Sequence, residues 1–253
     1  MHVTDWRILI DEGCSAAEQM ARDVELAAEP IPTLRLFRWD PPAVSLGLKQ
    51  PPPAWLGASG VAHVERPTGG GIAVHGSDVS VAVILPRAFA LPLPTILRAT
   101  CEATARLCRW YGAEAATLLE AEGHERITYC LTDRSSYAVL VGGRKIAGFA
   151  LRRFPAAWLI QGSLLVRSLP GGLAQAMPAD VLSQFRTRAI SLAEAAQHPV
   201  AEAEVMEAWG RQWPAWWEEI TSLRAQGSRF RAVAQNPEPP PPSQVVVGVA
   251  NAV

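Results

Sequence analysis

Short runs of apolar residues, separated by turn-forming residues, predict β-strands along much of the chain. Residues 33–39 (TLRLFRW) alternate apolar and polar side chains, as a half-buried strand does. Residues 79–85 (VSVAVIL) are apolar on both faces, which predicts an inner strand. The pattern over residues 126–167 is typical of a strand meander, beginning with RITYCL at 126–131. Shorter strands are expected at 6–10, 43–47 and 61–65.

Two helices are predicted from residues that typically begin or end a helix, and a helical layer is predicted further along the chain. Ser15 and Glu18 have the spacing of a capping box, ahead of a helix that runs to about residue 27. Pro94 opens a second helix, which ends at Gly112, a residue suited to a left-handed C-terminal cap. Beyond residue 169 we expect a helical layer, with segments near 179–186, 191–196 and 201–223, the last of them interrupted at Pro214.

The composition changes near the C-terminus. From residue 236 the chain reads PEPPPPSQ, a proline spacer that cannot form a packed element, followed by a short apolar end. The length of 253 residues suits a single large domain with a tail. We therefore predict a single large domain over residues 1–235, of a size that suits a catalytic domain, and a disordered tail over residues 236–253.

Composition and charge argue against several classes of protein. Hydrophobic residues make up 49% of the chain and charged residues 19%, which is typical of a globular protein. A net charge of -1 gives no reason to expect a nucleic-acid partner. No segment approaches the roughly 20 consecutive apolar residues of a membrane span, so we expect a cytoplasmic protein without a membrane partner. The scattered cysteines Cys14, Cys101, Cys108 and Cys130 predict reduced thiols and no metal site.

A glycine-rich segment, residues 65–75 (ERPTGGGIAVH), is the most informative part of the sequence. Three consecutive glycines can approach a ligand closely, adopt positive φ and direct N–H groups at a carbonyl or phosphate oxygen. The segment lacks the GK[ST] of a Walker A loop and is not followed by a helix, so nucleotide-binding interpretations lack their structural context. From the glycines alone, a flexible hairpin turn is an equally good interpretation.

Three further segments accompany the glycine-rich one over residues 34–165: LRLFRWDPPAVSLGLKQ at 34–50, GRKIAGFA at 143–150 and QGSLL at 161–165. Together with RPTGGG and His75, these ordered blocks resemble the lipoate-protein ligase and octanoyltransferase family. RPTGGG followed by His75 is similar to the family signature RRxTGG or RRxSGGG, which ends in a histidine, and GRKIAGFA is similar to its GRKxxGxA motif. Residues 34–50 resemble its arginine-containing strand and PxxSLGxxQ turn, and QGSLL resembles its HGSLL strand.

The resemblance implies an α+β fold like that of biotin ligases and class II aminoacyl-tRNA synthetases, with a largely antiparallel mixed sheet flanked by helices. It also implies an acyl tunnel, in which Lys145 reaches the carbonyl end of the substrate. From the residues alone, Lys145 beside a Gly-Gly turn is more typical of a solvated hairpin charge, and a lone His75 of an ordinary hydrogen-bonded residue. The implied substrate-binding residues are Arg66, Thr68, Gly69, Gly70, Gly71, His75, Gly148, Ala150, Gly162 and Ser163.

Cys130 bears on the choice between a transferase and a ligase. In cysteine-dependent octanoyltransferases of this fold a cysteine precedes a SWYEL-like strand, and YCLTDRSSYAVL places Cys130 at that position. The resemblance implies a thiolate of Cys130, activated by Lys145, that takes an octanoyl or lipoyl group from acyl carrier protein and passes it to a lysine of a lipoyl-domain protein. The acceptor would be a glycine cleavage H protein or a dehydrogenase E2-like protein, and no cofactor is required. Without the resemblance, Cys130 is more typical of a buried core thiol.

Departures from the family pattern leave two alternatives open. After His75 the ligases continue Asp-x-Gly-Asn, which is linked with the nucleotide and its metal, whereas this chain has GSDV at 76–79. LTDRSS replaces the common FxxPS, and Gln161 replaces the histidine before Gly-Ser, which puts substrate choice in question. The alternatives are a lipoate-protein ligase that uses ATP and magnesium and acts through lipoyl-AMP, and a non-catalytic member that binds a lipoyl-domain protein.

Overall fold

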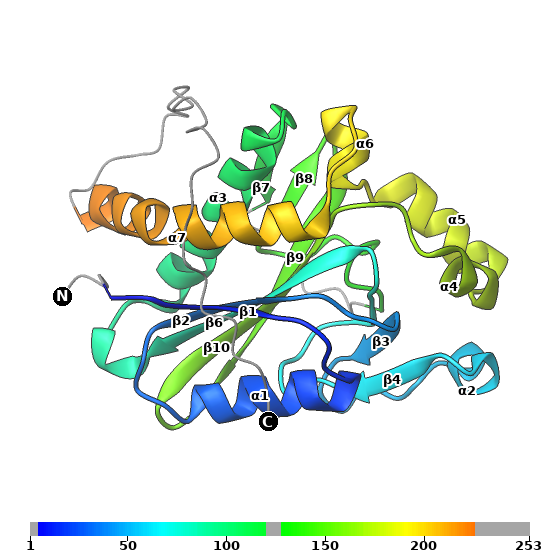
Figure 1. The fold of residues 1–253 in the computed structure, drawn as a ribbon, viewed down its shortest axis with the longest axis horizontal. Coiled ribbons are helices and arrows are strands. Elements are labelled where there is room, and N and C mark those ends of the chain that lie inside the picture. The colour runs from blue at the N-terminus through cyan, green and yellow to red at the C-terminus, as the bar shows by residue number, and fades with distance from the viewer. Residues whose placement is uncertain (1–4, 120–127, 226–253) are drawn as a thin grey trace.

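In the computed structural model, which describes residues 5–119 and 128–225, a seven-stranded sheet forms the centre of the protein (Figure 1). The strand order is β1-β2-β6-β10-β9-β8-β7; β1 and β2 pair in parallel and the other neighbours are antiparallel. The predicted α+β fold with a largely antiparallel mixed sheet is thereby confirmed. Its strands are β1 (Arg7–Asp11), β2 (Thr33–Phe37), β6 (Asp78–Pro86), β7 (Ala116–Leu119), β8 (Ala138–Val141), β9 (Arg144–Arg153) and β10 (Ala157–Leu165).

Helices cover both faces of this sheet. α3 (Leu93–Trp110) packs on α7 (Glu202–Ala225) over one face, and α1 (Ala16–Ala27) packs on β6 and β10 over the other. β6 packs against the helices on both faces, because successive side chains of a strand point to opposite faces. Val81 belongs to the apolar cluster that contains α3 and α7, and the next residue, Ala82, belongs to the cluster that contains α1. All of β6 is buried, which confirms the predicted inner strand.

A second, three-stranded sheet carries the glycine segment. Its order is β4-β3-β5, with β3 parallel to β4 and antiparallel to β5. The glycine segment joins β4 to β5, within this small sheet. An apolar cluster links the sheet to three short helices. These elements are β3 (Ala43–Leu46), β4 (Ala62–Glu65), β5 (Ala73–Val74), α2 (Ala54–Ser59), α4 (Gly171–Ala176) and α5 (Ala179–Arg188); the 3-10 turn Arg87–Phe89 and α6 (Leu192–Ala196) complete the fold.

The strand predicted at 33–39 is present, but the prediction that it is half-buried, with its polar face in water, is wrong. Every residue of β2 is buried, because α1 covers the side that carries Arg35. There the guanidinium of Arg35 pairs with Asp11 and Asp23 at N–O distances of 2.6 and 2.7 Å. Burial raises the pKa of Asp23, although Arg35 opposes that shift. An alternating pattern does not distinguish a polar face in water from one that is buried with partners.

Two further segments differ from their predictions. The described part of the segment predicted as a strand at 126–131 is a turn, in which Asp133 Oδ2 accepts the N–H groups of Thr128 and Tyr129 at 2.6 and 3.1 Å. α7 continues through Pro214, where an interruption was predicted. Buried Trp213 and its neighbours pack α7 onto the sheet, and this packing outweighs the hydrogen bond that proline removes.

The cysteines in the helix behave as the sequence suggests. Cys101 and Cys108 are buried in α3, and burial raises the pKa of Cys108 to about 12. All four cysteines are free thiols. The predicted tail at 236–253 lies outside the described residues. Within the described part of the chain, no helix has both the length and the apolar character needed to cross a membrane.

Candidate active site

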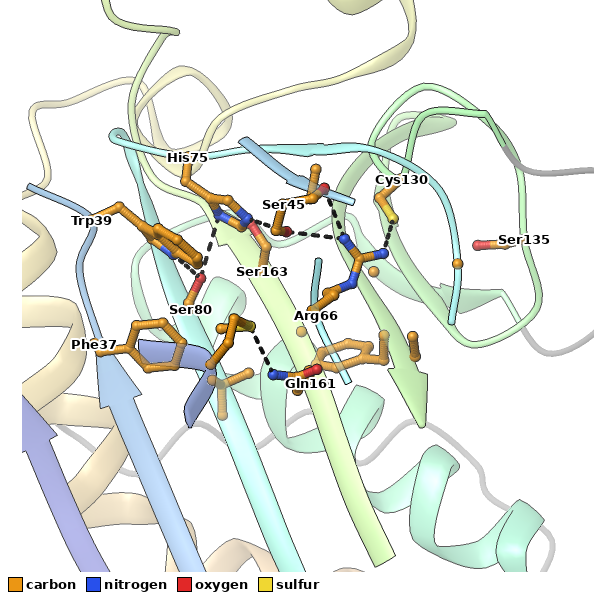
Figure 2. Close-up of a pocket in the computed structure, with 18 of the residues that line it drawn as sticks. Phe37, Trp39, Ser45, Arg66, His75, Ser80, Cys130, Ser135, Gln161 and Ser163 are labelled. Atoms are coloured by element: carbon orange, nitrogen blue, oxygen red, sulfur yellow. Dashed lines mark hydrogen bonds between the residues drawn. The ribbon is translucent and has the colours of Figure 1, made fainter. Parts of the chain in front are cut away.

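Four neighbouring strands of the main sheet form the floor of a pocket (Figure 2). The register places Phe37 opposite Ser80, Ser80 opposite Ser163, and Ser163 opposite Gly148. This row therefore runs across β2, β6, β10 and β9 on one face of the sheet. Met20 from α1 closes one side, and the small sheet and the turn that carries Cys130 close another.

The pocket brings together most of the residues that the resemblance implied. Cys130 and Arg66 lie at one end of it, and Phe37 and Trp39 lie toward the other (Figure 2). Thr68, Gly69 and Gly71 belong to the adjoining loop, outside the lining. The predicted site residues in the lining are Arg66, Gly70, His75, Cys130, Lys145, Gly148, Ala150, Gly162 and Ser163.

Cys130 is held against the glycine segment by its backbone and its side chain. Its N–H donates to the carbonyl of Ile72 at 2.8 Å, and the N–H of Ile72 donates to the carbonyl of Thr128 at 2.7 Å. The thiol donates to the carbonyl of Gly71, with Sγ and O 3.2 Å apart. Because both the peptide and the side chain are anchored, the sulfur has a defined position in the pocket lining.

Arg66 is the cation in hydrogen-bond contact with this sulfur. Its Nη2 lies 3.4 Å from Sγ of Cys130 and also donates to the carbonyls of Gly69 and Gly71, at 2.9 and 2.6 Å. Its Nη1 donates to the carbonyl and the hydroxyl of Ser45, at 3.0 and 2.9 Å. The glycine segment thus presents carbonyls to Arg66, and the guanidinium joins that segment to β3 and to Cys130.

Lys145 occupies a different position in the pocket. Its Nζ donates to the carbonyl of Asp133 at 3.1 Å and to the hydroxyl of Ser135 at 2.7 Å. Gly148 provides the room, since a Cβ there would lie 2.9 Å from Cε of Lys145. Burial lowers the pKa of Lys145, while Cys130 and Asp133 oppose that shift. Lys145 therefore holds the loop that follows Cys130 and keeps its ammonium in the lining.

His75 and Asp78 form a second buried polar pair at the pocket wall. Nδ1 of His75 lies 2.8 Å from Oδ2 of Asp78, and Nε2 lies 2.8 Å from the hydroxyl of Ser45. The ring of Trp39 stacks on His75 with 4.2 Å between centroids and 13° between planes. His75 thus contacts Ser45, which also accepts from Arg66.

Gln161, which stands where the resemblance leads one to expect a histidine, anchors the start of the glycine segment. Its Oε1 accepts from the hydroxyl of Thr68 at 2.6 Å, and its Nε2 donates to Oδ2 of Asp23 at 2.6 Å. Asp23 in turn pairs with Arg35. The loop is therefore tied through Gln161 to the buried charges between α1 and β2.

Gly47 permits the close approach of the glycine segment to β3. A Cβ at Gly47 would lie 2.0 Å from the carbonyl oxygen of Gly70. We expect Gly47→Ala to lower the free energy of unfolding by about 1–3 kcal/mol, the usual cost of overpacking, and to lower activity. Gly57→Ala is the matched control, since a Cβ at Gly57 meets nothing within 4 Å. Thermal unfolding of both variants checks this, and an unchanged Gly47→Ala midpoint contradicts it.

The sequence by itself indicates no role for Ser45, Asp78 or Trp39. Ser45 and Trp39 were inside a recognised block, but nothing in the block distinguished them from structural residues. Asp78 carried a usable signal, because a carboxylate at the start of a wholly apolar inner strand requires buried partners. Identifying those partners required the tertiary structure.

Known proteins resemble the chain in sequence and in structure. The profile of the lipoyl protein ligase A/B catalytic domain matches residues 15–213. Octanoyltransferase LipM of Symbiobacterium thermophilum is 31% identical over 239 residues, which cover 81% of this chain and 84% of that protein. A lipoate-protein ligase A bound with ATP has a TM-score of 0.63 at 19% identity, covering 88% of this chain and 95% of its own.

A further structure resembles the chain in fold. It comes from the bi-partite lipoate protein ligase and E2 lipoyl domain of Thermoplasma acidophilum, with a TM-score of 0.61 at 19% identity. The match covers 88% of this chain and 93% of that chain. At such identities the two ligase structures show a shared fold.

Proposed function

The chain belongs to the lipoyl protein ligase A/B catalytic domain family and is an enzyme of octanoyl transfer in protein lipoylation, and we propose that it acts through a thioester on Cys130. One observation carries the proposal: the sulfur of Cys130 lies 3.4 Å from Nη2 of buried Arg66, at one end of a pocket to which Phe37, Trp39 and Phe149 contribute apolar side chains. A guanidinium beside a sulfur stabilises the thiolate, which is the nucleophilic form of cysteine.

In the first step the Cys130 thiolate attacks the carbonyl carbon of a carrier thioester. A new carbon–sulfur bond forms at Cys130, and the carrier thiolate leaves and takes up a proton. Donor and product are both thioesters of nearly equal energy, so this exchange requires no activation by a nucleotide. Octanoyl-acyl carrier protein is the proposed donor.

The acyl chain would then extend along the pocket, away from Cys130. Met20, Phe37 and Phe149 contribute apolar surface there. Removing this surface from water contributes roughly 0.8 kcal/mol for each buried methylene of the acyl chain. The apolar side chains in this part of the pocket therefore suit the hydrocarbon chain of an acyl group.

In the second step a lysine amine of the acceptor attacks the carbonyl carbon of the enzyme thioester. A carbon–nitrogen bond forms, the amine loses a proton, and the Cys130 thiolate leaves with Arg66 again beside it. The Lys145 ammonium has three N–H donors, of which two bond to Asp133 and Ser135. We assign the third to the oxyanion that develops in both steps. The E2 lipoyl domain studied with the Thermoplasma ligase supports a lipoyl-domain protein as the acceptor.

Transfer is expected to proceed without ATP. A ligase must first make an acyl-adenylate, whereas a thioester donor already carries an activated acyl group. The test incubates the protein with octanoyl-acyl carrier protein and a lipoyl domain, and follows the mass of the lipoyl domain. Equal rates with and without ATP and magnesium are expected; strict dependence on both would assign the chain to the ligases. Tight binding of the lipoyl domain without any mass increase would identify a non-catalytic binding protein.

A further inference from the structure

A chain of buried hydrogen bonds leads from the sulfur of Cys130 into the pocket wall. Arg66, which contacts that sulfur, donates from Nη1 to the hydroxyl of Ser45 at 2.9 Å. The same hydroxyl lies 2.8 Å from Nε2 of His75 (Figure 2). On the other side of the ring, Nδ1 of His75 lies 2.8 Å from Oδ2 of Asp78. These side chains come from β3, the glycine segment and β6, and each of the three hydrogen-bonded contacts is buried.

The chemistry of the groups limits which of them can donate. Arginine has donors and no acceptor, so Arg66 donates to the hydroxyl oxygen of Ser45, and the hydroxyl hydrogen of Ser45 points away from Arg66. On its other side the hydroxyl lies 2.8 Å from Nε2 of His75, and the opposite ring nitrogen, Nδ1, faces Oδ2 of Asp78. The ring of His75 therefore connects the hydroxyl of Ser45 to the carboxylate of Asp78.

The groups around Asp78 donate hydrogen bonds to its carboxylate. Burial by itself raises the pKa of this carboxyl, but His75, Ser163 and the N–H of Gly76 outweigh it, and the pKa lies below the ordinary value. Ser163 donates to Oδ2 at 2.7 Å and Ser80 at 3.1 Å, while the N–H of Gly76 donates to Oδ1 at 3.0 Å. A carboxylate anchored in this way orients the imidazole ring that is bonded to it.

We propose that Asp78, His75 and Ser45 are positioning residues that hold the guanidinium of Arg66 against the sulfur of Cys130. The carboxylate fixes the orientation of the His75 ring, the ring orients the Ser45 hydroxyl, and the hydroxyl accepts from Arg66. This inference rests on the proposed role of Cys130 as the nucleophile. It adds that the position of the cation beside the sulfur is set by a polar chain that begins at Asp78.

Asp78, His75 and Ser45 are hydrogen-bonded in the same order as the acid, histidine and serine of a serine-type catalytic triad. The donation from Arg66 to the oxygen of Ser45 argues against a nucleophilic role, because it withdraws the lone pair that would attack a carbonyl. Ser45 is also 1% exposed. Both observations suit an acceptor that orients a guanidinium.

Two substitutions of His75 distinguish a role in positioning Arg66 from a role in packing the pocket wall. In His75→Gln the side-chain amide can replace Nε2 as the partner of the Ser45 hydroxyl. In His75→Asn the shorter side chain reaches only the position of Nδ1, so it keeps a donor for Asp78 and loses the partner of the Ser45 hydroxyl. Ser45→Ala removes the acceptor for Arg66 directly. Thr104→Ala is the control, since it removes a buried hydroxyl in α3 that donates to the carbonyl of Thr100.

The measurement is the rate at which iodoacetamide alkylates Cys130, followed by peptide mass spectrometry, with thermal unfolding in parallel. His75→Asn and Ser45→Ala should react roughly tenfold or more slowly, the effect expected from losing one hydrogen bond to a charged group. His75→Gln should stay within about threefold of the unmodified chain, and Thr104→Ala should match it. Equal rates in all variants, or a His75→Gln protein as slow as His75→Asn, would overturn the proposal.

This readout uses no acyl donor, so the two proposals can fail separately. The predicted pattern of alkylation together with absent octanoyl transfer would refute the function and support the positioning role. Octanoyl transfer through Cys130 together with uniform alkylation rates would support the function and refute the positioning role.

Discussion

Octanoyl-acyl carrier protein, given to the enzyme without an acceptor, should leave one octanoyl group on Cys130. The sulfur is anchored at one end of the pocket beside Arg66, and in the absence of an acceptor amine the thioester should persist. Hydroxylamine should remove the label, as it removes other thioesters. Cys130→Ala should lower transfer to a lipoyl domain by at least about a thousandfold, because the covalent route requires the nucleophile.

Peptide mass spectrometry locates the label, and the other cysteines serve as controls. Cys101 and Cys108 are buried in α3 and should remain unlabelled. Cys14→Ala should transfer at the normal rate, since Cys14 lies outside the pocket lining. A label on another cysteine, or a normal rate in Cys130→Ala, would exclude the covalent mechanism and favour direct transfer or ligation.

Lys145→Met should lower transfer by about a hundredfold to a thousandfold, the usual loss when one donor to an oxyanion is removed. Methionine matches the length of the lysine stem, so the variant should remain folded. Lys145→Arg should also fail, because the guanidinium is bulkier than an ammonium and Gly148 leaves little room beside Cε. Single-turnover transfer from the trapped thioester measures the effect on the second step directly.

The neighbouring Arg144 supplies a matched control. Its side chain bonds to Glu194 and to the carbonyl of Ala189, away from the pocket lining. Arg144→Met removes the same type of charge from the same strand and should transfer at the normal rate. A folded Lys145→Met protein with near-normal transfer would remove Lys145 from the mechanism.

Elements with complete burial or strong caps could be predicted from the sequence. β6 is apolar on both faces, and α1 begins at a capping box in which Ser15 and Glu18 bond each other's backbone. The turn at 128–133 could not be predicted, because TYCL has the composition of a strand, whereas the turn depends on hydrogen bonds to the side chain of Asp133 and to the carbonyl of Tyr129. The break predicted at Pro214 failed for a similar reason: tertiary packing outweighed a local preference.

The sequence by itself indicated the fold class, through the resemblance of its motifs, and it named the candidate reactive groups, since glycine, cysteine and lysine at fixed motif positions carry their own chemistry. Only the tertiary structure decided which groups meet. Arg66 and Cys130 are 64 residues apart, and their contact depends on how a turn docks against a glycine loop. Asp78, His75 and Ser45 meet because β3, β5 and β6 come together at one edge of the pocket. Such contacts depend on strand register and long-range packing, which short-range patterns of residues do not encode.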